Sequence, residues 1–104
     1  MKHRVTIADN FHYMDAGEYV DGGEFDAYAD ALVHAQAIVD ESLSSNWQPG
    51  DRPDALMARY TQFGDDPFIV PPGEPPFSAR EYARARVEAI CREREGWSPG
   101  PLVP

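Results

Sequence analysis

The segment Phe77-Ser78-Ala79-Arg80-Glu81-Tyr82 carries the clearest structural signal in the chain, because it has the pattern of a helix N-terminus. Ser78 can accept a hydrogen bond from the backbone N–H three residues on, while Glu81 can reach back to the backbone N–H of the serine. Phe77 and Tyr82 flank this capping box and can form a hydrophobic staple. Apolar residues continue at helical spacing, so the segment predicts a helix that ends near residue 95.

Two more helices are predicted upstream of this one. A helix over residues 27–45 follows Asp26, whose carboxylate is the expected N-cap. Its apolar stripe consists of Tyr28, Leu32, Ala35, Val39 and Leu43. A second helix is expected to have Asp51 as N-cap, Pro53 in its first turn and Gly64 at its end. Its dense apolar face consists of Leu56, Met57, Tyr60 and Phe63.

Three segments are predicted to be strands. Residues 3–8 alternate between apolar and polar side chains, residues 18–25 favour a strand with a bulge at Gly22-Gly23, and residues 67–71 form a short strand. Pro67 and Pro71 cannot donate to a sheet ladder, so we expect an edge strand or prolines at the strand ends. The sequence therefore predicts an α+β fold, a small antiparallel sheet with three helices packed on one face. We expect one domain over residues 1–96 and a proline-rich tail over 97–104.

The amino-acid composition excludes some classes of protein and argues against some partners. The 104 residues include 42% hydrophobic side chains, which is too many for a disordered chain, and 18 acids against 9 bases give a formal charge of -9. Such a charge argues against nucleic acid and against an anionic membrane surface as partners. Cys91 is the single cysteine, so it cannot form an intrachain disulfide, and we expect it to be a small buried apolar side chain. With no signal-peptide pattern at the start, the expected location is cytoplasmic.

Three phrases together resemble a family of short bacterial proteins with no assigned activity. They are Asp9-Asn10-Phe11-His12-Tyr13-Met14-Asp15, Phe63-Gly64-Asp65-Asp66-Pro67-Phe68-Ile69 and Phe77-Ser78-Ala79-Arg80-Glu81-Tyr82-Ala83. The resemblance extends from Val5 to about Arg94. It implies a single-domain bacterial protein and transfers no catalytic residue, substrate or cofactor.

The first of these phrases is also the first candidate site. Asp9, His12 and Asp15 could offer two carboxylates and an imidazole to a divalent metal or act as an acid–base pair, with Asn10 beside them and Tyr60 nearby. This requires the backbone to turn, because a continuous strand would place Asp9 and His12 on opposite faces. The alternative is structural: Asp9 and Asn10 satisfy a turn, and the aromatic side chains fold back onto the core.

A second candidate is the pair Asp65 and Asp66 together with Tyr60, and Arg59 is a further residue that could join them. Adjacent carboxylates can share a proton or hold a cation. The alternative, which we prefer, is that consecutive aspartates in a turn point apart and face water.

The helix over residues 79–95 is the cationic element of the chain. Its five arginines are Arg80, Arg84, Arg86, Arg92 and Arg94, and four glutamates leave the helix nearly neutral. Arg84 and Glu88 are four residues apart and are expected to pair on a solvated face. The functional alternative is that these arginines form a surface for docking to a partner or to a second copy of the chain.

The sequence contains no nucleophile elbow, no glycine-rich phosphate loop and no zinc-ligand spacing, so we predict neither catalytic residues, nor a metal, nor a cofactor. The expected function is a non-catalytic protein-interaction or regulatory module with a protein partner or a homo-oligomer. The alternative is a small-molecule or metal-binding protein, including an enzyme, that uses residues 9–15. A third hypothesis is an acidic mimic of nucleic acid. Residues 1–46 carry -7, residues 47–77 carry -3 and residues 78–104 carry +1, so the acids are concentrated in the first half.

Overall fold

The chain folds as two strands, two helices, a third strand and a third helix. A computed structural model describes residues 2–9 and 20–95. Along the chain the elements are β1 (His3–Asp9), β2 (Val20–Phe25), α1 (Tyr28–Asn46), α2 (Pro53–Phe63), β3 (Asp65–Val70) and α3 (Ala79–Glu95). This order confirms the predicted α+β class. The predicted tail, residues 97–104, lies outside the described residues.

The sheet has the order β2-β1-β3, and both pairs of neighbouring strands are antiparallel. Val5 in the central strand lies opposite Ile69, and Ile7 lies opposite Pro67. β3 is an edge strand, one of the two expected positions, and an edge is where a sheet tolerates a proline such as Pro67. The register of β1 with β2 shifts between Arg4 and Thr6, opposite the Gly22-Gly23 pair, so the predicted bulge is present.

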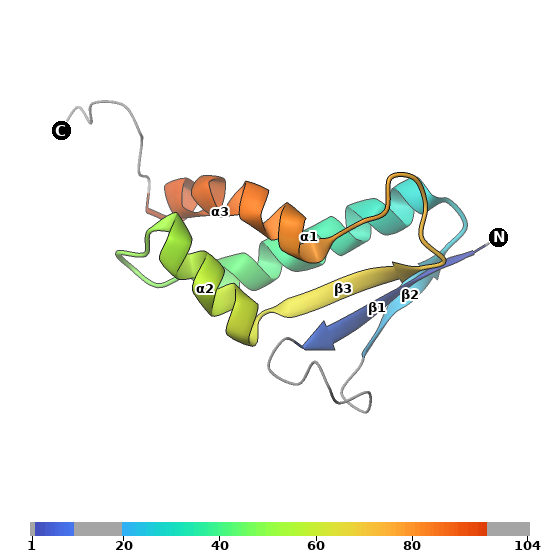
Figure 1. Cartoon of the computed structure of the whole chain (residues 1–104), viewed down its shortest axis with the longest axis horizontal. Coiled ribbons are helices and arrows are strands. Elements are labelled where there is room, and N and C mark those ends of the chain that lie inside the picture. Colours follow the sequence, from blue (N-terminus) through green and yellow to red (C-terminus); the bar gives the residue numbers. More distant parts are fainter. Residues whose placement is uncertain (1, 10–19, 96–104) are drawn as a thin grey trace.

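Helix α1 is the centre of the structure and separates two groups of core side chains. One group joins its N-terminal half to the sheet and contains Val5, Ala31, Ala35 and Ile69. The other joins its C-terminal half to α2 and α3 and contains Val39, Leu43, Leu56, Tyr60, Ala79, Ala83, Val87, Ile90 and Cys91. Cys91 is therefore buried, as expected. The helices lie on one side of the sheet, with α1 running alongside the strands and α2 next to the start of β3 (Figure 1).

The predicted start of α3 is confirmed. The backbone N–H of Glu81 donates to Ser78 Oγ at 3.3 Å, and the rings of Phe77 and Tyr82 lie 6.0 Å apart. The capping interaction and the staple fix where this helix begins and how its first turn meets the core.

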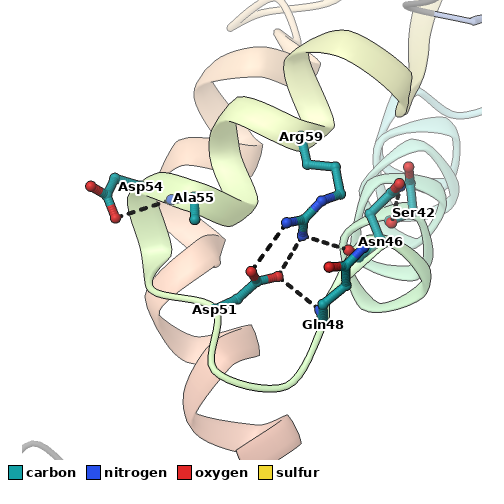
Figure 2. A network of polar contacts seen from close by, with 7 residues as sticks. All are labelled: Ser42, Asn46, Gln48, Asp51, Asp54, Ala55 and Arg59. Atoms are coloured by element: carbon teal, nitrogen blue, oxygen red, sulfur yellow. Dashed lines mark hydrogen bonds and ion pairs between the residues drawn. The ribbon is translucent and has the colours of Figure 1, made fainter.

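The predicted caps of the other two helices are wrong. Ala27, not Asp26, is the N-cap of α1, and it makes no side-chain cap bond, while Asp26 lies 3.5 Å from Lys2 Nζ. The N-cap of α2 is Arg52, again without a side-chain cap bond. Asp51 instead accepts the backbone N–H of Gln48 and two N–H groups of Arg59 (Figure 2). Its carboxylate therefore closes the α1–α2 loop.

None of the helices among the described residues is both long enough and apolar enough to cross a bilayer.

Candidate functional site

The structure describes only part of the first predicted site, the segment of residues 9–15. Asn10, His12 and Asp15 lie outside the described residues, as does the side chain of Asp9. The backbone of Asp9 ends β1 and lies opposite Asp65, the first residue of β3. The structure thus brings the start of the 9–15 segment beside the second candidate, Asp65-Asp66.

Tyr60 is a core residue whose hydroxyl has a defined structural task. The side chain is 1% exposed, and its hydroxyl donates to the backbone carbonyl of Asp65 at 2.6 Å. Burial, reinforced by the negative charges of Asp66 and Asp65, raises the pKa of the Tyr60 phenol, so the hydroxyl remains a donor at neutral pH. The backbone N–H of Asp65 donates to Ser42 Oγ at 3.0 Å. Two buried side chains therefore bind the backbone C=O and N–H of Asp65 at the start of β3.

The sequence suggested that Asp65 and Asp66 lie in a turn before the third strand. In the structure they are instead the first two residues of β3. Consecutive strand residues project to opposite faces, so the two carboxylates point apart, as the preferred interpretation expected; its expectation that both face water is wrong for Asp66. Asp65 is exposed and Asp66 is partly buried. Burial raises the pKa of the Asp66 carboxyl, and the nearby positive charge of Arg80 opposes that rise.

Arg59, which the second candidate site included, points away from the two aspartates. It donates to Asp51, with one bond of 3.2 Å, and to the backbone carbonyl of Asn46 at 2.9 Å (Figure 2). Its hydrogen bonds hold the pKa of Asp51 below the ordinary value. This arginine joins α2 to the end of α1 and is not part of a site beside Tyr60.

The arginines of α3 do not form one free surface. Arg86 Nε donates to Asp40 of α1 at 2.9 Å, and the Tyr82 hydroxyl donates to the other oxygen of the same carboxylate at 3.0 Å. Arg92 pairs with Glu88, so the predicted Arg84–Glu88 pair is replaced by one in which the glutamate precedes the arginine, the more favourable order on a helix. Arg80 and Arg84 are exposed, and the side chain of Arg94 lies outside the described part.

A pocket of about 350 Å³ lies at the end of the sheet where β1 and β3 meet the two helices that precede β3. We call it the sheet-end pocket. It is lined by Ile7, Ile38, Glu41, Ser42, Ser45, Asn46, Phe63 and Asp65. Phe63 was predicted to belong to the inward face of α2, but it is 51% exposed.

Sequence inspection singled out only Asp65 of the polar side chains in this lining. Glu41, Ser42, Ser45 and Asn46 project from neighbouring turns at one side of α1. Their spacing places them on one helix face, but only the fold brings Ile7 and Phe63 opposite them.

In the described part of the chain, no three His, Cys, Asp or Glu side chains are close enough together to hold a metal ion. Comparison of the chain with protein-family models, with curated proteins and with solved structures finds no match.

Proposed function

We propose that this protein is a non-catalytic binding module that recognises a basic segment of another protein. The observation that carries the proposal is that, in the described part of the chain, most of the basic side chains pair with acids of the same chain, while many acids do not pair. Among the side chains that the structure describes, ion pairs with acids engage five bases, Lys2, Arg4, Arg59, Arg86 and Arg92. The surplus of acid is therefore left to face the surroundings.

The surplus is large within the described residues. Residues 10–19 contain two of the 18 acids, Asp15 and Glu18, and none of the nine bases, so by sequence residues 2–9 and 20–95 carry 16 acids and nine bases. Asp30, Glu41, Asp54 and Glu74 are exposed or partly exposed acids that form no ion pair with any described side chain. A field of this sign attracts a basic partner over about one Debye length, ~8 Å at physiological salt, and repels nucleic acid.

The side chains near the predicted sites support binding over catalysis. Tyr60 and Ser42 use their hydroxyl groups to hold the backbone of Asp65. Arg59 and Arg86 use their guanidinium groups to hold Asp51 and Asp40. Groups that would be candidate acids, bases or electrophiles are thus committed to the architecture.

The test is calorimetric titration of the full chain with a short amphipathic peptide made of leucine and lysine, acetylated and amidated. The control peptide has glutamate in place of every lysine. We expect the lysine peptide to bind and its affinity to fall about tenfold or more between ~0.05 M and ~0.5 M salt, because charge attraction is screened. If neither peptide binds, or both bind equally well, the proposal is refuted.

A further inference from the structure

The sheet-end pocket has a wall made by successive turns of α1. Ile38, Glu41, Ser42 and Ser45 follow one another at helical spacing along this wall. Ile7 and Asp65 close it from the sheet, and Phe63 stands at the end of α2. The pocket thus combines three apolar side chains with a polar side.

The polar atoms of the lining are mainly hydrogen-bond acceptors. Ser45 Oγ donates its only hydrogen to the Glu41 carbonyl at 2.8 Å, so its oxygen can only accept further bonds. Asn46 Nδ2 donates to the Ser42 carbonyl at 2.8 Å, which leaves its Oδ1 as an acceptor (Figure 2). The carboxylates of Glu41 and Asp65 accept only, as ionised acids must. A lining of this kind favours a ligand rich in N–H donors.

The charge of the lining also favours a cationic ligand with N–H donors. Glu41 and Asp65 are the charged members of the lining among the described residues, and none of these lining side chains is basic. The volume is near the low end of the ~300–1,000 Å³ range of small-ligand pockets, so it suits one extended side chain. An aliphatic stem fits the apolar part, while a cationic head with several N–H donors fits the acceptors.

We propose that the sheet-end pocket receives a lysine or arginine side chain from the basic segment that the module recognises. The stem of that side chain packs on Ile38 and Phe63, and its cationic head is bound at Glu41 and Ser45. This inference rests on the proposed function and specifies where that function is carried out. A second copy of the chain is a poorer occupant, because two copies of net charge -9 repel each other.

The test uses the leucine–lysine peptide with the native chain and two pocket variants. Glu41→Gln removes the pocket charge, and Ser45→Trp fills the pocket without changing the charge. Glu74→Gln in an exposed loop matches the first in charge, and Ala58→Trp on an exposed position of α2 matches the second in bulk. Affinity is measured by calorimetry, and the binding position is located by amide chemical-shift changes in the ¹⁵N-labelled native chain.

We expect Glu41→Gln to weaken binding about threefold to fivefold, as for a partly exposed ion pair, and Ser45→Trp to weaken it about tenfold or more by exclusion. The two controls should stay within about twofold of the native affinity. Amides of Ile7, Ser42 and Ser45 should shift most. Thermal unfolding of each variant checks that it is folded, and Glu41→Gln decides the matter if Ser45→Trp does not fold.

The outcomes separate the two proposals. If the native chain does not bind the peptide, the proposed function fails and this inference fails with it. If the native chain binds but each pocket variant matches its control, the function stands and the pocket is the wrong site. If analytical ultracentrifugation shows a native dimer that Glu41→Gln dissociates, the occupant is a second copy and the proposal of a separate basic partner is overturned.

Discussion

Replacing Gly64 with alanine should destabilise the protein through a steric clash alone. The backbone of Gly64 has a φ of -78°, which alanine adopts without strain. A Cβ built there would lie 2.2 Å from Tyr60 Cδ1 and 2.8 Å from the Tyr60 carbonyl oxygen. The Tyr60 ring is 1% exposed and its hydroxyl bonds Asp65, so neither contact can relax by rotating a free side chain.

Overpacking of this kind costs typically 1–3 kcal/mol, and the backbone contact places Gly64→Ala at the upper end of that range. Reduced entropy of the unfolded chain returns about 0.4–1 kcal/mol, so we expect a net loss of about 2 kcal/mol. For a domain of this size such a loss lowers the melting temperature by roughly 8–16 °C. Urea unfolding followed by far-ultraviolet circular dichroism measures it directly.

Two further variants test whether the clash is the cause. Gly50 has a φ of +88° and no atom within 4 Å of an added Cβ, so Gly50→Ala should cost only the ~1–2 kcal/mol of a left-handed alanine. Tyr60→Val removes Cδ1 and Cε1, so adding Gly64→Ala in that background should cost about 1 kcal/mol less than in the native chain. A native-like or raised urea midpoint for Gly64→Ala, or an equal cost in both backgrounds, would refute the reasoning.

Three other substitutions test the polar contacts. Arg59 lowers the pKa of Asp51, so this pair stabilises the fold above the ordinary aspartate pKa of ~3.9, and its contribution is lost as the pH falls through the lowered value. Asp51→Asn should therefore lower the melting temperature at pH 7, and the difference from the native chain should shrink as the pH is lowered. Burial raises the pKa of Asp66, so the ionised carboxylate opposes folding. Asp66→Asn should raise the melting temperature at pH 7 and leave it nearly unchanged at about pH 3. A lower melting temperature at pH 7 would contradict this assignment. Tyr82→Phe removes the bond to Asp40 and should cost about 0.5–1.5 kcal/mol in urea unfolding; an unchanged midpoint would show that water replaces this bond.

The elements that the sequence predicted best are those whose signals are local. The Ser78–Glu81 spacing and the Phe77–Tyr82 pair fix the start of α3 within six residues, and both contacts form. The doubled glycine at residues 22–23 predicts the bulge for a similar reason, because the glycines themselves occupy it. Signals of this kind need no knowledge of the rest of the fold.

Carboxylates near a helix start were harder to assign, because a cap competes with other partners. Asp51 had the right position for a cap, but Arg59, two turns into α2, offers two N–H donors and a positive charge. A bidentate bond to a guanidinium is stronger than a neutral cap bond, so the carboxylate turns toward the arginine. The choice depends on where the Arg59 side chain points, which spacing alone does not determine.

The sheet-end pocket could not be predicted because its two sides come from distant parts of the chain. Helical spacing predicts that Glu41 and Ser45 share a face, but it does not say that Ile7 lies opposite. Phe63 illustrates the difficulty further: its spacing in α2 is that of an inward residue, yet α2 ends there and the ring stands half exposed beside the pocket.

The same long-range pairing moves the expected interaction surface from the arginines of α3 to the acidic side of α1. The sequence counted five arginines on one helix, but the Arg86–Asp40 pair joins residues 46 positions apart and uses one of them to bind α3 to α1. Glu88 engages Arg92 in the same way along α3. The ion pairs of the described residues engage five bases and seven acids, because Arg4 and Arg86 each contact two carboxylates. They therefore engage more than half of the nine bases but fewer than half of the 18 acids. The ratio of acids to bases is therefore higher among the side chains outside these pairs than in the composition as a whole. Glu41 belongs to that remainder and lines a pocket with apolar walls, and for this reason a basic side chain is the ligand that we expect there.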